Sequence, residues 1–129
     1  FVAGNMPESE LPVNVVLLGC LSKIELSKML RSCHFFIFFS ENESCPNIVL
    51  EAMASGLPVI YKDSGGTVEI VGDAGINASV ETFRHAFETI QKNYEEFKVK
   101  AHARAKKEFS VNEIIPAYLG KMKTFAEAS

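Results

Sequence analysis

The stretch that decides the fold is residues 40–75, S-E-N-E-S-C-P-N-I-V-L-E-A-M-A-S-G-L-P-V-I-Y-K-D-S-G-G-T-V-E-I-V-G-D-A-G. Pro46 suits the first turn of a helix, where its missing N–H has no partner to lose, and Gly56 suits the end of that helix. Residues 57–61 then have the apolar content of a buried strand. A tight loop at residues 63–66 leads into a second helix. This order predicts a parallel α/β domain with an anion-binding edge, because free N–H groups point outward where helices begin.

The flanking sequence repeats the alternation. Residues 14–19 are continuously apolar, which predicts a strand buried on both faces. Ser22 and Glu25 form a capping box that starts a helix, and residues 34–39 are the next strand. We expect a Rossmann-like, doubly wound parallel sheet with helices on both faces.

Helical patterns dominate after Gly75. We expect one helix behind a Ser79 cap, with apolar positions from Val80 to Tyr94, and a second over residues 97–105. In that second segment the alanine, lysine and arginine content outweighs a strand-like alternation. A last helix follows Ser110.

Composition limits the classes of protein. The chain has 129 residues, 47% of them hydrophobic, and a net charge of −3, which gives no support for a nucleic-acid partner. Three scattered cysteines suit a reducing compartment, and no apolar run is long enough to cross a bilayer, so we expect a cytoplasmic protein. Phe1 is not methionine and falls in an apparent strand. We therefore expect residues 1–129 to be a single domain that is truncated at its N-terminus and belongs to a longer chain.

Two glutamates are the candidate functional carboxylates. Glu43 lies in the loop after a strand, and Glu51 lies one turn into the next helix, on the same face as Asn47. We expect Glu51 to be buried among apolar neighbours, where a carboxylate needs a polar partner. The hydroxyl groups of a bound ligand would supply that partner. The favourable effect of the helix dipole would also account for Glu51 as a purely structural residue.

Glu43 and Glu51, with seven residues between them, the run L-E-A-M-A-S-G-L-P-V-I and the following G-G-T-V-E-I-V resemble the C-terminal, donor-binding half of family-four retaining glycosyltransferases of the GT-B type. The resemblance covers nearly the whole chain. It implies that Glu43 contacts the transferred sugar as the catalytic carboxylate and that Glu51 binds the ribose of a nucleoside-diphosphate sugar. It further implies a substrate-binding wall made of Pro46, Asn47, Ile48, Val49, Leu21, Ser64, Gly65, Gly66 and Thr67.

The resemblance implies no cofactor besides the sugar-nucleotide donor, and the sequence offers no metal cluster. The family's basic pair for the diphosphate would lie upstream of Phe1. The acceptor-binding N-terminal half is also missing, and it is the expected route to a peripheral membrane association. We therefore expect no turnover from this fragment alone. Two alternatives stay open: a sugar-nucleotide epimerase of similar shape, and a non-catalytic nucleotide-binding α/β module.

Overall fold

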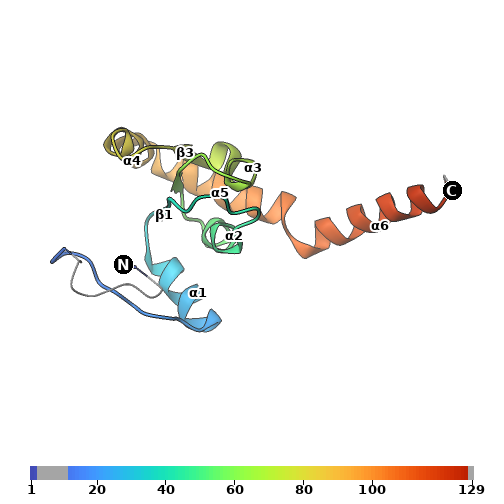
Figure 1. The fold of residues 1–129 in the computed structure, drawn as a ribbon, viewed down its shortest axis with the longest axis horizontal. Helices are drawn as coiled ribbons and strands as arrows, with labels where there is room; N and C mark the ends of the chain where they lie inside the picture. The colour runs from blue at the N-terminus through green and yellow to red at the C-terminus, as the bar shows by residue number, and fades with distance from the viewer. Residues whose placement is uncertain (3–11, 128–129) are drawn as a thin grey trace.

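The computed structural model describes residues 1–2 and 12–127, with side chains described as far as Thr124. Its centre is a three-stranded parallel sheet in the order β1-β2-β3. The strands are β1 (Phe36–Phe38), β2 (Val59–Tyr61) and β3 (Gly75–Asn77). Figure 1 shows the helices around this sheet and α6 extending away from it. The open parallel sheet flanked by helices confirms the predicted α/β class.

The helices begin and end at sequence signals. Helix α1 (Lys23–Ser32) starts at the predicted capping box, where the Ser22 N–H donates to the Glu25 carboxylate. Helix α2 (Asn47–Ala54) follows Pro46 and ends before Gly56, which has a positive φ of 82°. The other elements are α3 (Thr67–Val71), the 3-10 turn η2 (Gly72–Ala74), α4 (Phe83–Lys92), α5 (Tyr94–Glu108) and α6 (Val111–Glu127).

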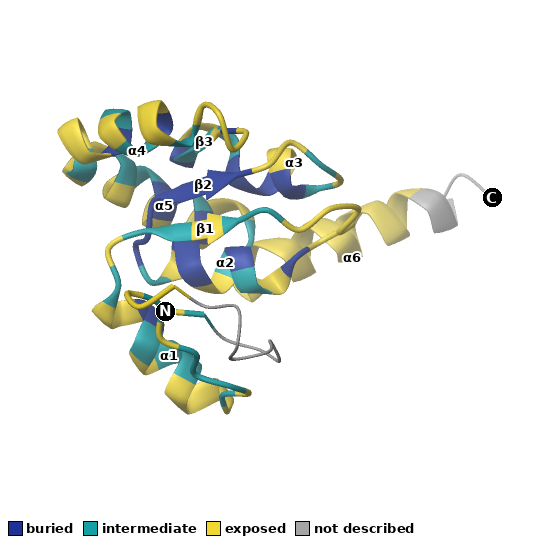
Figure 2. Ribbon diagram, turned by 60° about the vertical axis from the view of Figure 1, so that its left-hand side comes forward, coloured by how far each residue is buried: buried dark blue, intermediate teal, exposed yellow. Residues whose placement is uncertain are grey.

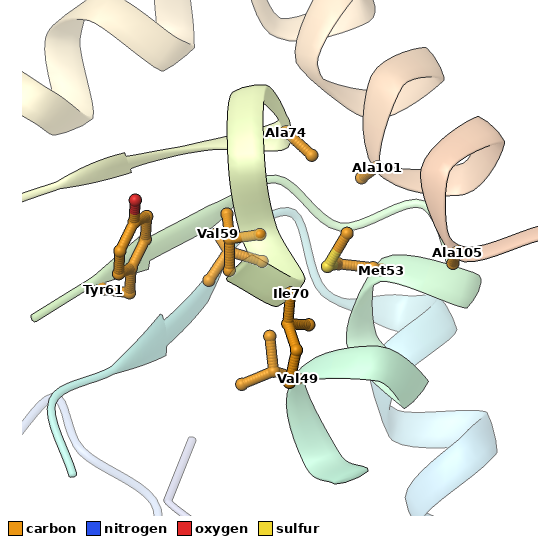
Figure 3. Close-up of a cluster of buried hydrophobic side chains, with 9 residues drawn as sticks. Val49, Met53, Val59, Tyr61, Ile70, Ala74, Ala101 and Ala105 are labelled. Atoms are coloured by element: carbon orange, nitrogen blue, oxygen red, sulfur yellow. The ribbon is translucent and has the colours of Figure 1, made fainter. Parts of the chain in front are cut away.

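Successive residues of β2 point to opposite faces of the sheet, and both faces are covered. Val59 and Tyr61 pack in a core with side chains of α2, α3 and α5 (Figure 3). Ile60 packs on the other face against Ala86 and Ile90 of α4. Figure 2 shows β2 as the buried centre of the molecule, which confirms that helices cover both faces.

Two elements differ from the sequence predictions. Residues 14–19 form no regular strand. Within the described part of the chain only Leu17 pairs there, in an isolated parallel bridge with Val2, and Val16 is exposed. A continuous apolar run therefore does not mean burial on both faces here. Phe1 was expected at the end of a strand that turns into a loop by residue 5; Val2 makes the bridge, and residues 3–5 lie outside the described residues.

The helix expected behind Ser79 begins at Phe83 instead. The Ser79 hydroxyl accepts from the Thr82 N–H and so stabilises a turn before the helix, and Val80 is left exposed. Tyr94 belongs to α5. The last helix carries its apolar stripe on an exposed surface, where Ile114, Ile115, Tyr118, Leu119 and Met122 are all more than two-fifths exposed.

Candidate functional site

Two loops meet where β1 and β2 end. The β1 loop comprises residues 39–46 and the β2 loop residues 62–66. The Asn42 N–H donates to the Ser64 hydroxyl at 2.9 Å, and the Gly66 N–H donates to the Glu43 carbonyl, also at 2.9 Å. Parallel strands put their carboxyl ends at one edge of a sheet, the usual ligand edge in open α/β folds. The structure thus brings Glu43 together with Ser64 and Gly66.

The glycine pair allows this close approach. A Cβ atom on Gly65 would lie 2.3 Å from the Glu43 carbonyl oxygen, and one on Gly66 would lie 2.0 Å from the Ser44 carbonyl oxygen. Both distances are far inside van der Waals contact. Gly65 also has a φ of 61°, a backbone conformation that glycine adopts at little cost. The β2 loop therefore packs backbone to backbone against the β1 loop.

The first turn of α2 offers free backbone donors beside these loops. Pro46 is buried at the N-cap and supplies no side-chain cap. The Val49 N–H donates to the Pro46 carbonyl at 3.0 Å, whereas no described residue accepts from the N–H groups of Asn47 and Ile48. Free donors at a helix N-terminus favour an anion, and this first turn contains no acidic side chain that could fill the role.

Glu51 is exposed, so the expected burial of its carboxylate is wrong. Helical periodicity explains the error: Val49, Ala52 and Met53 face the core, and Glu51 faces outward with Asn47. Among the described residues, no ion pair or side-chain hydrogen bond engages the Glu51 carboxylate. Its need for a polar partner therefore no longer follows from burial.

Glu51 nevertheless lines concave surface. It forms part of a groove of about 300 Å³ between α1 and α2, whose other walls include Lys23, Ser27 and Arg31. It also lines a second hollow of about 370 Å³ toward His102 and Phe109. The carboxylate is thus available to a ligand that lies over α2.

The other predicted site residues differ in how far they are buried. The Glu43 carboxylate is exposed and accepts from the Ser40 hydroxyl at 3.4 Å. Thr67 is fully buried, and its hydroxyl has no hydrogen-bond partner among the described residues. Leu21 lies half-buried in the turn before α1, and no contact given by the structure joins it to Glu43 or Glu51.

Charge at the loop edge is partly neutralised. Lys62 pairs with Glu41 of the β1 loop, and the hydrogen bond and charge of Lys62 lower the pKa of the Glu41 carboxyl. The pKa of Tyr61 is raised, first by burial of its phenol and then by the nearby charge of Asp63. Lys62 is therefore held by a carboxylate rather than free in solvent.

Sequence reasoning missed three residues that shape these loops. Asn42 has a φ of 60°, which asparagine tolerates better than most residues, so its place in S-E-N-E was a usable signal. The Asn77 side chain accepts from the Asp63 N–H at 3.1 Å. Arg104 donates to two carbonyls of α3, and nothing local in the α5 sequence indicates this.

The residues of the two loops also lie inside a match to a known protein family. The sequence profile of the family described as Glycosyl transferases group 1 matches residues 6–108, which is most of the chain and contains both loops and both glutamates. The chain belongs to this family. The sequence predicted a glycosyltransferase of this kind, and the family match confirms that prediction.

Two curated relatives are similar over part of the chain. Sulfoquinovosyl transferase SQD2 of Arabidopsis thaliana is 43% identical over 56 residues, which cover 43% of this chain and 11% of the relative. A GDP-mannose-dependent alpha-mannosyltransferase of Mycobacterium tuberculosis is 34% identical over 80 residues, covering 60% of this chain and 21% of the relative. This group 1 chain thus spans only a tenth to a fifth of the relatives that it matches.

The described residues contain no group of three His, Cys, Asp or Glu side chains that could hold a metal ion. None of the described helices is long and apolar enough to cross a membrane.

Proposed function

We propose that this chain is the donor-binding part of a retaining glycosyltransferase, which transfers a sugar from a nucleoside-diphosphate sugar to a hydroxyl acceptor. The observation that carries the proposal is the packing of the Gly65–Gly66 turn against the Glu43 backbone beside the free N–H groups of α2. Membership of the group 1 family supports it, as does the named donor of one relative, GDP-mannose. The acceptor half and any peripheral membrane contact belong to a longer chain under this proposal.

The diphosphate would bind at the first turn of α2. There the N–H groups of Asn47 and Ile48 and the positive end of the helix dipole face the charge. When the glycosidic bond breaks, the departing nucleoside diphosphate gains negative charge. Donors fixed in advance by the fold stabilise that charge without having to reorganise.

The two glutamates would have different roles. Glu51, on the outer face of α2, would accept hydrogen bonds from the two ribose hydroxyls of the donor. Glu43, in the loop held by Gly66, would face the hydroxyls of the transferred sugar and stabilise it as it leaves. This division of roles is chemically sensible because Glu43 precedes the first turn of α2 in the chain and Glu51 follows it, so the two carboxylates would flank a diphosphate bound at that turn.

Isothermal titration with UDP and GDP tests the donor assignment. Hydrogen bonds to a charged group are each worth about 1.5–3 kcal/mol, so Glu51→Ala should weaken binding by about tenfold or more. Glu88→Ala is the matched control, since Glu88 is also an exposed helical glutamate but lies on α4. Equal binding by wild type and Glu51→Ala would reject the ribose assignment. Sugar transfer by the complete protein, with the anomeric configuration of the product read by NMR, tests catalysis and retention.

A further inference from the structure

Helix α3 lies between the Gly65–Gly66 turn and its contacts with α5, and it is too short to be stable without other elements packed against it. It spans only Thr67–Val71, a single turn, and an isolated turn of helix is unstable in water. Its N-terminal end is continuous with the Gly65–Gly66 turn. The position of that turn is therefore coupled to the contacts that hold the other end of α3, as well as to the backbone packing of the turn against the β1 loop.

Arg104 of α5 fixes that end. Its Nε donates to the Ile70 carbonyl at 2.9 Å and its Nη2 to the Glu69 carbonyl at 2.6 Å. These carbonyls belong to the last turn of α3, where backbone acceptors lack partners within the helix. A cation at a helix C-terminus also interacts favourably with the helix dipole.

The guanidinium of Arg104 is itself held in place. Its Nη1 donates to Glu108 at 3.0 Å, and its side chain is only 21% exposed. It also lies over the ring of Phe109, with 5.8 Å between the guanidinium carbon and the ring centroid. The aligned forks of a guanidinium suit two neighbouring acceptors, which a lysine ammonium cannot match in the same geometry.

Gly72 leaves the space for this contact. A Cβ atom on Gly72 would lie 2.7 Å from the guanidinium carbon of Arg104, and the residue has a φ of 52°. A larger residue at position 72 would therefore displace the guanidinium from α3. In Figure 3, Ile70 of α3 points toward Val49 of α2, and Ala105 of α5 belongs to the same buried cluster.

We propose that Arg104 is a positioning residue for the candidate site, which acts through α3 on the Gly65–Gly66 turn and hence on the loop that carries Glu43. The Gly66 N–H bonds to the Glu43 carbonyl, so the turn and the loop move together. Arg104 touches no ligand in this scheme. The step from loop position to donor binding rests on the proposed function, whereas the step from Arg104 to loop position does not.

Hydrogen exchange of single amides tests the first step without any ligand. In Arg104→Ala, the Gly66 amide should exchange about tenfold faster, since a protecting hydrogen bond is lost to local opening. The Ile60 amide of β2, in the centre of the sheet, should change only as much as global stability does. Ile90→Val, a mildly destabilising change in the α4 cluster, is the control and should accelerate both amides equally.

Two more variants separate positioning from general stability. Glu108→Gln removes the ion pair but keeps both carbonyl contacts of Arg104, and it should leave the Gly66 amide at the wild-type rate. Arg104→Lys, which reaches one carbonyl at most, should give an intermediate rate and also serves if Arg104→Ala does not fold. Unchanged Gly66 exchange in both Arg104 variants, or a rise that matches Ile60, would overturn the proposal.

Titration with UDP tests the second step. Arg104→Ala should bind UDP less tightly than Glu108→Gln does. If wild type binds neither UDP nor GDP, the proposed function fails, and the exchange experiment still decides whether Arg104 positions the turn. If exchange at Gly66 rises and UDP affinity is unchanged, the link from the turn to the donor is wrong.

Discussion

Replacing Gly66 by alanine tests the backbone contact on which the site depends. Gly66 has a φ of −82°, which alanine adopts without strain, so the substitution isolates the steric effect of one methyl group. The added Cβ would lie 2.0 Å from the Ser44 carbonyl oxygen, whereas ordinary contact begins at 3.4 Å. The two loops would have to separate by about 1.4 Å.

That separation has a calculable cost. The Gly66 N–H to Glu43 carbonyl hydrogen bond is 2.9 Å long and would be broken or badly strained. A net hydrogen bond contributes about 1 kcal/mol, and forcing a methyl group into a packed contact costs about 1–3 kcal/mol. Because the loops are largely exposed and can yield, we expect Gly66→Ala to reduce the free energy of unfolding by about 1–3 kcal/mol.

Urea unfolding followed by circular dichroism measures this difference, and titration with UDP measures its effect on binding. Gly120→Ala is the control, since Gly120 lies in α6 with nothing within 4 Å of an added Cβ. It should preserve stability or raise it by up to about 1 kcal/mol through helix propensity. An unfolding midpoint for Gly66→Ala equal to that of wild type would refute the argument that the two loops touch through their backbones.

Three further changes probe the core and the titrating groups. Met53→Ala should lower the free energy of unfolding by about 2–5 kcal/mol in urea titrations, because this fully buried side chain leaves a cavity beneath α2. The pKa of Tyr61 is raised by burial, so the folded state loses stability as pH rises above the ordinary phenol value of 10.0. Tyr61→Phe should reduce this loss in melting curves recorded at several alkaline pH values. An unchanged dependence of melting temperature on pH would contradict the prediction. The Ser22 hydrogen bonds lower the pKa of Glu25, which stabilises the fold above pH 4.5 and less so as pH falls; Ser22→Ala should therefore destabilise the protein at pH 7 more than at pH 3.

The sequence predicted the elements whose signals are local. Pro46 and Gly56 delimit α2 as expected, and the Ser22 capping box forms. The run before Tyr61 is a fully buried strand. These features depend on the conformations that single residues allow, so neighbouring sequence is sufficient to read them.

Other features depend on long-range packing and were wrong or missed. The apolar run at residues 14–19 has the composition of a buried strand, but burial depends on which elements lie against it, and among the residues that the structure describes Leu17 alone pairs. Glu51 stands in an apolar sequence, yet helical periodicity turns it outward. Arg104 meets α3 through bonds that join residues 34 and 35 positions apart, a separation that no local pattern encodes.

For the candidate site, the sequence indicated a turn and a set of site residues but not the contacts between the two loops. The glycine pair and the preceding strand indicated a tight turn, and the resemblance supplied the roles of Glu43 and Glu51, which stay predictions. The contact between Gly66 and the Glu43 backbone requires a particular spacing between β1 and β2, and that spacing follows from the parallel register of the two strands. The resemblance also implied Asn47, Ile48 and Val49 as binding residues; the N–H groups of Asn47 and Ile48 have no acceptor among the described residues, whereas the Val49 N–H donates to Pro46.

Thr67 leaves a local conflict in the fold. Its side chain is wholly enclosed, and its hydroxyl finds no acceptor or donor among the described residues. Enclosing an unsatisfied hydroxyl costs about 1–3 kcal/mol, and valine has nearly the same shape without that cost. The residue next to the Gly65–Gly66 turn thus makes an unfavourable contribution to the stability of the fold. We expect Thr67→Val to have a higher melting temperature than the natural sequence. The sequence beside this turn is therefore not optimised for stability, which is common near residues that bind a ligand.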